Sequence, residues 1–304
     1  MRIIGRIERV TLKKRIIGIK TFSRIIYLYF QNGHINLFKR YLYAGTYIDL
    51  DYEEDKTYIK NGIAAYYVNY VHQVFRFNDF EKIQYYDRFQ IDNSLSSFLD
   101  SLGNIMFLDL EMTMPSYTFK GKGYISEIIQ VGYVLVNGMG EEMARYSQYI
   151  EPNHHMDLSK RTLNFLKIDA KEFHQNSISY IEFYNDFSMI LKKYHPTIVI
   201  FGKNDRLMLS ESFVLNQVDS LNEYMRFVNL SKLIQTYYHL QNEPGLFKLF
   251  QIYYENYAPQ SHDAFDDSYV TMAVFNAFKK DVKHETDYFL KIKESFKMQK
   301  TISS

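Results

Sequence analysis

Two carboxylates lie at the end of an apolar segment in this chain of 304 residues. Residues 104–113 predict a buried strand, and the strand period of two places Asp109 and Glu111 on the same face. Two carboxylates side by side at the end of a buried strand repel each other and lose hydration unless a cation lies between them. A hard divalent ion prefers such oxygen ligands. The segment therefore predicts a metal site.

Two later segments carry acids and an imidazole where an expected strand ends or an expected helix begins. Residues 197–202 are a nearly continuous apolar run, which predicts a parallel strand buried on both faces, and Asp205 follows its carboxyl end. Open α/β sheets build their sites at that end of the strands. A five-residue step separates His262 from Asp267 at the start of a helix, so both side chains can face one cleft.

Alternative roles exist for the residues around this helix start. A histidine in such a place can simply cap the helix, although Ser261 or Asp263 can serve as the cap instead. Asp266 differs from Asp267 by one helical position, about 100° around the axis. We therefore assign Asp266 to solvent or to a supporting hydrogen bond, and Asp267 to the cleft.

The elements that must hold these groups predict the fold class. Strands at 104–113, 128–137 and 145–151 follow one another as a meander, and the runs at 197–202 and 226–230 add two more strands between helical stretches. The fold class expected is α/β, with a mixed five-stranded sheet flanked by helices.

Three motifs in this order resemble those of the DEDDh 3′–5′ exonucleases, which have a ribonuclease H-like fold. They are Phe-Leu-Asp-Leu-Glu-Met-Thr at 107–113, Phe-Gly-Lys-Asn-Asp at 201–205 and His-Asp-Ala-Phe-Asp-Asp at 262–267. The Asp-x-Glu-x-Thr form of the first motif, the run at 127–132 and the double aspartate resemble the RNA-trimming subgroup, which includes the histone-mRNA 3′ exonuclease and KapD-type bacterial proteins. The sequence departs from the subgroup at Gln130, where many relatives carry Glu, and at residues 206–208.

The resemblance implies a role for each motif residue. Asp109 would bridge two Mg²⁺ or Mn²⁺ ions, Glu111 and Asp267 would hold the ion that carries the attacking water, and Asp205 would complete the shell. His262 would be the general base. The implied enzyme is a 3′–5′ exoribonuclease that removes 5′-mononucleotides from single-stranded RNA. A DNA exonuclease and a non-catalytic nucleic-acid-binding adaptor remain the alternatives, and the intact acids and histidine argue against the adaptor.

Residues after the first motif are candidates for substrate contact. Met112 and Thr113 would line the pocket of the terminal nucleotide, with plain packing as the alternative for Met112. Lys120 and Lys122 would neutralise phosphates, unless they are merely solvated. His154 and His155 lack the spaced partners of a zinc site and are expected at the surface.

The N-terminal part has a different character. Residues 1–80 hold 13 Lys+Arg and 7 Asp+Glu. This excess indicates that the N-terminal part binds a polyanion, or that its basic face only complements the acidic remainder of the same chain. Strands are predicted at 2–10, 15–30, 35–41, 46–52 and 63–77, without a helix. The pattern is similar to an OB-fold, or to an SH3-like barrel. Its predicted contacts with single-stranded nucleic acid are Lys13, Lys14, Arg15, Tyr27 and Tyr29, although the two tyrosines could equally be barrel surface or core.

The domain prediction has four parts: an OB-like domain at 1–77, a helical linker at 78–103, the exonuclease domain at 104–285, and a helix and tail at 286–304 that packs back on the domain. The chain has no Cys, so disulfides, thiolate metal sites and thiol nucleophiles are excluded. No membrane span, secretion signal or Gly-rich phosphate loop is recognised, and a cytoplasmic location is expected. Dimers are common among such enzymes, so a homodimer is an option that the sequence does not decide.

Overall fold

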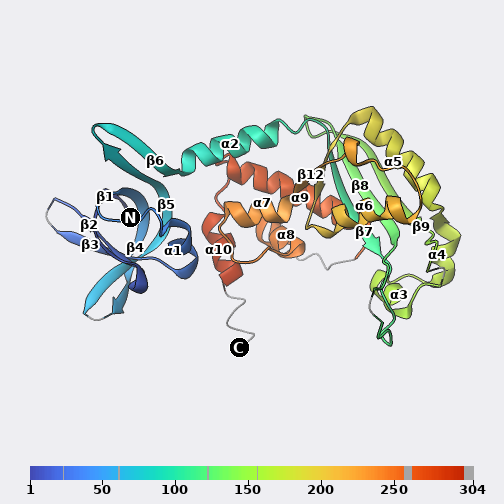
Figure 1. Ribbon diagram of the computed structural model, residues 1–304, viewed down its shortest axis with the longest axis horizontal. Coiled ribbons are helices and arrows are strands. Elements are labelled where there is room, and N and C mark those ends of the chain that lie inside the picture. Colours follow the sequence, from blue (N-terminus) through green and yellow to red (C-terminus); the bar gives the residue numbers. More distant parts are fainter. Residues whose placement is uncertain (23, 61, 122, 156, 257–261, 298–304) are drawn as a thin grey trace. The chain divides into compact units, whose positions relative to one another are not determined.

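The structure is a computed structural model that describes residues 1–297 except 23, 61, 122, 156 and 257–261. The chain forms two compact units (Figure 1). The first holds residues 1–97 and 239–241, and the second holds residues 98–238 together with the chain from 242 onward.

The first unit is a closed barrel. Its strands pair in the order β3-β2-β1-β4-β5-β6, and β3 also pairs with β5 in parallel, which closes a ring of five strands. Ile7, Leu28, Ile48 and Val74 are fully buried inside it. The elements are β1 Arg2–Thr11, β2 Ile16–Lys20, β3 Ile25–Tyr29, α1 Asn32–Phe38, β4 Tyr47–Lys60, β5 Ile63–Asn78 and β6 Glu81–Asp87, with a short 3₁₀ turn at Leu12–Lys14 between β1 and β2.

Three predictions for this part of the chain are wrong. The single strand expected at 15–30 is instead two strands, β2 and β3, which pair antiparallel with each other. The expected strand at 35–41 is largely replaced by helix α1, because Ile35, Phe38 and Leu42 recur at helical spacing and all three are buried. The expected helix over 78–103 begins only at Arg88, as α2 Arg88–Asp100. Residues 81–87 instead form β6, which pairs with the end of β5 across a tight turn and so extends the barrel sheet.

The second unit is a mixed sheet in the order β10-β9-β8-β7-β11-β12. β7, β8 and β9 are antiparallel neighbours, whereas β11 runs parallel to β7 and to β12. The strands are β7 Ile105–Met112, β8 Ile128–Val136, β9 Glu142–Ile150, β10 Ser177–Ile178, β11 Thr197–Ile200 and β12 Arg226–Asn229. The helix-flanked mixed sheet confirms the predicted α/β class, with a sixth strand of two residues that the sequence pattern did not predict.

Helices cover both faces of this sheet (Figure 1). Residues Met106, Leu108 and Leu110 of β7 point to a core shared with α5 and α6. The alternate residues point to the other face, where Phe107 packs edge-on against Phe275 of α9 with ring centroids 5.3 Å apart. The helices are α3 Lys160–Leu166, α4 Ala170–Asn176, α5 Tyr180–Tyr194, α6 Asn204–Leu215, α7 Leu230–Tyr237, α8 Leu246–Tyr254, α9 Ala264–Val282 and α10 Phe289–Lys297. Strand period therefore places Asp109 and Glu111 on the face covered by α9.

The C-terminal helix α10 packs on the second unit. Ile292 is fully buried, and the Tyr288 hydroxyl donates to the carbonyl oxygen of Tyr253 at 3.0 Å. The Lys248 ammonium donates to the carbonyl oxygen of Ser295 at 2.7 Å. These contacts tie α10 to α8.

Candidate active site

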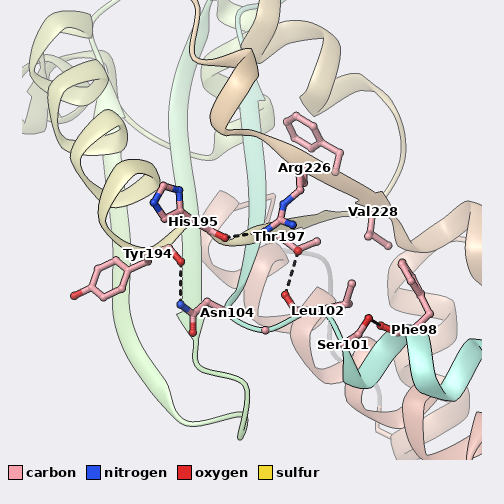
Figure 2. A pocket seen from close by; sticks show the side chains of 11 residues that line it. Phe98, Ser101, Leu102, Asn104, Tyr194, His195, Thr197, Arg226 and Val228 are labelled. Carbon is pink, nitrogen blue, oxygen red and sulfur yellow. Dashed lines mark hydrogen bonds between the residues drawn. The ribbon is translucent and has the colours of Figure 1, made fainter.

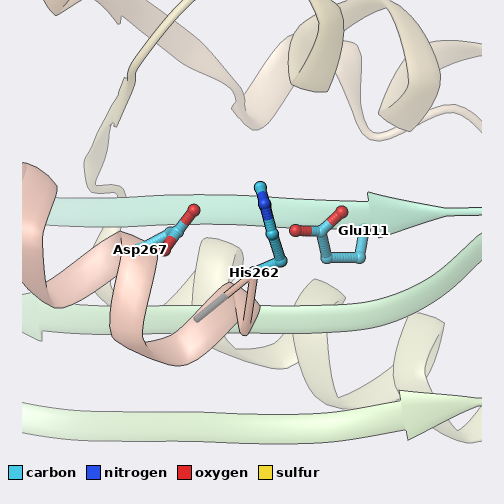
Figure 3. Close-up of side chains that lie close together, drawn as sticks. All are labelled: Glu111, His262 and Asp267. Carbon is cyan, nitrogen blue, oxygen red and sulfur yellow. The ribbon is translucent and has the colours of Figure 1, made fainter. Parts of the chain in front are cut away.

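The end of β7 and the start of α9 bring three functional groups together. Ligand atoms of Glu111, His262 and Asp267 all lie within 4.8 Å of one another. Figure 3 shows Glu111 on the strand and His262 and Asp267 at the helix, with the imidazole between the two carboxyl groups in this view. Asp267 is buried and its neighbour Asp266 is exposed, which is the arrangement that helical spacing predicts.

Four acids share the electrostatics of this site. Burial raises the pKa of Asp109 well above its ordinary 3.8, and Asp205, Asp267 and Glu111 raise it further. Burial, followed by the charges of Asp267 and Asp205, raises the pKa of Glu111 from 4.5 to about 8. Burial also raises the pKa of Asp205 from 3.8 to about 6, although hydrogen bonds from the backbone N–H groups of Asp205 itself and of Leu110 lower it in part. The cluster thus gathers carboxyl groups where water is scarce, so that without a cation the ionisation of all of them is disfavoured.

Such a cluster fits hard divalent ions. Its donor set is carboxylate oxygen with one imidazole nearby, which suits Mg²⁺ or Mn²⁺ better than a soft metal. Cations between the carboxylates would relieve the repulsion and the lost hydration that raise the pKa values. Among the described residues, this is the one place where three or more such side chains gather at ligand distances.

His262 lies beside the acids in an unusual backbone conformation. Its φ of 55° is in the left-handed region, which L residues rarely adopt. Its ring lies 4.1 Å from the ring of Phe165 in α3, and burial together with the charge of Lys167 lowers the pKa of His262 below 6.5. The helix cap is Asp263, whose carboxylate accepts from the backbone N–H of Phe265, so His262 does not cap α9. The imidazole is kept neutral near pH 7.

The residues after the first motif have mixed positions. Met112 packs against the core on the α5 and α6 side, because strand period turns it away from the acids. Thr113 is buried, and its hydroxyl accepts from the backbone N–H of Glu127 at 2.9 Å. Lys120 is exposed in the following loop, and Lys122 lies outside the described residues. The structure therefore turns the Met112 side chain away from the acid cluster, and the Thr113 hydroxyl is engaged with the backbone of Glu127.

Glu127, the first residue of the run at 127–132, has an organising role that the sequence analysis did not assign to it. Its buried carboxylate accepts from the backbone N–H groups of Asn153, His154 and His155 at 2.7, 3.0 and 2.8 Å. The His154 ring lies 3.2 Å from the same carboxylate. His154 and His155 therefore belong to the loop that Glu127 anchors. The signal in the sequence for this role was a single Glu at the start of an apolar strand.

The predicted basic contacts of the barrel lie at the turn between β1 and β2. Lys13 is exposed there, while Lys14 and Arg15 are half-buried. Arg15 has a φ of 60°, and its guanidinium lies 5.1 Å from the centre of the Tyr29 ring. The turn thus presents positive charge next to an aromatic group.

The predicted tyrosines lie on one face of β3, as its period requires, but differ in exposure. Tyr29 is only 7% exposed, stacks on Tyr58 of β4 at 3.9 Å and meets the edge of Tyr67 of β5 at 5.2 Å. Tyr27 is half-buried, and its hydroxyl accepts from Arg9 at 3.0 Å. Tyr29 is therefore packed within the protein, and Tyr27 retains some open surface.

A cavity of about 420 Å³ lies at the end of the second unit's sheet away from the acids, where β7, β11 and β12 begin (Figure 2). Its polar groups already bond within the chain: Asn104 donates to the carbonyl oxygen of Tyr194 at 2.9 Å, and Arg226 donates to that of His195 at 3.3 Å. A second cavity of about 550 Å³ lies between residues 124–126 and α6. Neither cavity contains the acid cluster.

Comparison with known proteins identifies the family. Residues 106–275 match the family model described as Exonuclease, RNase_T. The chain belongs to this exonuclease family. The matched segment runs from β7 to α9 and contains all three motifs, so the second unit carries a 3′–5′ exonuclease domain of the DEDDh type.

Individual relatives are distant. The exonuclease is 24% identical over 183 residues to a probable 3′–5′ exonuclease KapD of Bacillus subtilis (strain 168), over 60% of this chain and 87% of that protein. Two solved 3′-exonuclease structures, one of 3′-end specific recognition of a histone mRNA stem-loop and one full-length, superpose with TM-scores of 0.50 and 0.51 at 17% identity. Each match covers 60% of this chain, but 65% and 62% of those chains, which is less than two thirds of their length.

These likenesses confirm the exonuclease fold of the second unit. None of the described helices combines the length and the apolar character needed to cross a membrane.

Proposed function

We propose that this chain is a divalent-metal-dependent 3′–5′ exoribonuclease that releases 5′-mononucleotides from the 3′ end of single-stranded RNA. The observation that carries the proposal is the group of Asp109, Glu111, Asp205 and Asp267 beside a neutral His262. Burial raises the pKa values of Asp109, Glu111 and Asp205, and the charge of Asp267 raises those of Asp109 and Glu111 further. The arrangement suits hydrolysis at phosphorus, because it can hold cations and a proton acceptor around one point.

The four acids would hold two Mg²⁺ or Mn²⁺ ions, which when bound supply positive charge for the attacking and leaving oxygens. His262 accepts a proton from the attacking water, and its lowered pKa keeps the imidazole unprotonated for that task. The water oxygen forms a bond to phosphorus, and the bond from phosphorus to the 3′ oxygen of the preceding nucleotide breaks. A mononucleotide with a 5′ phosphate leaves, and the 3′ oxygen of the shortened strand takes up a proton from solvent and becomes a 3′ hydroxyl.

RNA is favoured over DNA by the form of the motifs. The Asp-x-Glu-x-Thr sequence at 109–113 and the Asp266-Asp267 pair are those of the RNA-trimming subgroup. The solved relative with a histone mRNA stem-loop is consistent with that choice.

We propose that the barrel is an OB-fold that holds the substrate strand. The ring β1-β2-β3-β5-β4, with α1 between β3 and β4, supports this assignment. OB-folds bind oligonucleotides on the face of strands 2 and 3 and on the loops beside it. In this barrel that region carries Lys13, Lys14 and Arg15 at the turn after β1, and Tyr27 on β3. Lys56 adds a further positive charge, 5.1 Å from the centre of the Tyr67 ring.

The proposal is tested with 5′-labelled single-stranded RNA and matched DNA, incubated with Mg²⁺, Mn²⁺ or EDTA. We expect a metal-dependent ladder that shortens from the 3′ end, faster on RNA than on DNA. The variant Asp109→Asn, which keeps the shape of the side chain, should give no ladder. Faster cleavage of DNA would make the enzyme a DNA exonuclease, and tight binding without cleavage under any metal would make it an adaptor.

A further inference from the structure

The start of helix α9 rests directly on strand β8. A side chain at Gly132 would place its Cβ 2.2 Å from the backbone nitrogen of Phe265, so the helix backbone lies against the strand backbone. Two residues earlier on the same face of β8, Gln130 is 2% exposed. Gln130 pairs across the sheet with Glu111, and Gly132 pairs with Asp109. The two β8 residues on which α9 rests are therefore the cross-strand neighbours of the two acids on β7.

Gln130 makes two hydrogen bonds to the start of this helix. Its amide nitrogen donates to Oδ2 of Asp263 at 2.6 Å, and its amide oxygen accepts from the backbone N–H of Ala264 at 3.3 Å. The other oxygen of Asp263 accepts from the backbone N–H groups of Phe265 and Asp266 at 3.0 and 3.1 Å. The Asp263 carboxylate is thus shared between the strand and the first turn of the helix.

These bonds fix the chain between two groups that must face Glu111. His262 directly precedes Asp263, and Asp267 follows one helical turn later. The φ of 55° at His262 is a conformation that the surrounding structure has to hold in place. From β8, the Gln130 side chain holds this point of the chain by hydrogen bonds to Asp263 and Ala264.

We propose that Gln130 is a positioning residue of the exonuclease: its amide, bonded to Asp263, sets the place of His262 and Asp267 relative to Glu111. The proposal rests on the function proposed above, since it concerns the geometry of that reaction. An amide is required because it donates to the Asp263 carboxylate and accepts from Ala264 at once. A glutamate would instead set a second carboxylate against Asp263 and opposite Glu111.

The experiment exchanges the amide of Gln130 and the carboxylate of Asp263 between the two positions. Gln130→Glu removes the donor, and Asp263→Asn in the same chain restores one, because the asparagine amide can donate to the new carboxylate while its oxygen still caps the helix. We expect Gln130→Glu to lower kcat on single-stranded RNA by about 10- to 100-fold, as for a displacement of about 1 Å of reacting groups. KM should change little, and the double variant should recover most of kcat.

Two further variants complete the set. Gln130→Met removes the hydrogen bonds without adding a charge, so it replaces Gln130→Glu if that variant does not fold. Gln148→Glu is the matched control, because Gln148 lies on β9 and its amide donates to Asn176 instead of α9. We expect Gln130→Met to lower kcat and Gln148→Glu to leave it unchanged.

A second measurement does not depend on catalysis. Hydrogen exchange at the amides of Phe265 and Asp266 should speed up in Gln130→Glu and return to the wild-type rate in the double variant. A Gln130→Glu enzyme with wild-type kcat and wild-type exchange would overturn the positioning role, as would a loss of kcat that Asp263→Asn does not recover. A wild-type chain that cleaves neither RNA nor DNA, yet shows the expected exchange pattern, would overturn the proposed function and leave the positioning contact standing.

Discussion

Replacing Glu111 by glutamine should stabilise the metal-free protein and, in the same step, abolish cleavage. The pKa of Glu111 rises from 4.5 to about 8 on folding, so the folded chain keeps a proton that the unfolded chain loses. For a carboxyl group of this kind, stability falls as the pH rises from about 4.5 to 8. The Glu111 carboxyl group therefore lowers the free energy of unfolding by less than about 1 kcal/mol at pH 5 and by on the order of 5 kcal/mol above pH 8.

Glu111→Gln removes that cost without changing the size of the side chain. In EDTA, we expect its Tm to exceed that of the wild type by up to roughly 10–20 °C at pH 8.5 and by far less at pH 5. Mg²⁺ or Mn²⁺ should raise the Tm of the wild type at pH 8.5 and should do so less in the variant. The assay is thermal unfolding followed by circular dichroism across this pH range.

The control is Glu285→Gln, an exposed glutamate in the turn after α9. Its Tm should follow the wild type at every pH. Equal Tm values for wild type and Glu111→Gln at pH 8.5 in EDTA, or a difference that does not change with pH, would refute the reasoning that Glu111 is held in a repulsive acidic cluster.

Three further predictions follow from the geometry. Gly132→Ala should displace α9 and lower both Tm and activity, since its Cβ would lie 2.2 Å from the nitrogen of Phe265; an active variant with wild-type Tm would contradict this close packing. Alanine at all three of residues 13–15 should weaken RNA binding and reduce the slope of log binding constant against log salt concentration by about 2, at about 0.7 for each phosphate that is no longer neutralised. Single-turnover cleavage at saturating enzyme should stay intact. A large drop in cleavage at saturation would contradict the assignment of RNA binding to the barrel and of hydrolysis to the second unit. His262→Ala should lower kcat by about 10²- to 10⁴-fold and remove a limb of the pH profile, on which the wild-type rate rises with pH through a pKa below 6.5; an unchanged limb would assign it to another group.

The sequence predicted the catalytic face well because short-range periods determine it. The strand period alone placed Asp109 and Glu111 on one face, and the helical period separated Asp267 from the exposed Asp266. Both statements need only residues that are close in the chain.

Features that depend on distant contacts were missed. The bond from Gln130 to Asp263 joins residues 133 positions apart. For Tyr29 the sequence left base stacking and packing in the barrel open, and the long β4–β5 hairpin, which brings Tyr58 and Tyr67 onto its ring, is what packs it. That hairpin was itself underestimated, because the polar run at 53–56 hides the continuation of β4 to Lys60.

Short elements were the other source of error. Strand β10 has two residues, which is too short for any period to appear. In β6, Ile83 and Tyr86 have a spacing that suits one face of a helix, and only pairing with β5 decides for a strand.

The central claim is that the acids facing α9 form the hydrolytic centre, and neighbouring residues of that helix test it most directly. Initial rates of 3′ shortening should be measured on 5′-labelled single-stranded RNA with Mg²⁺ for the wild type, Asp267→Asn and Asp266→Asn. The account predicts that Asp267→Asn falls to the background without enzyme, while Asp266→Asn, changed at an exposed position one residue away, keeps the wild-type rate. Equal rates for the two variants, or abolished cleavage in Asp266→Asn alone, would contradict it.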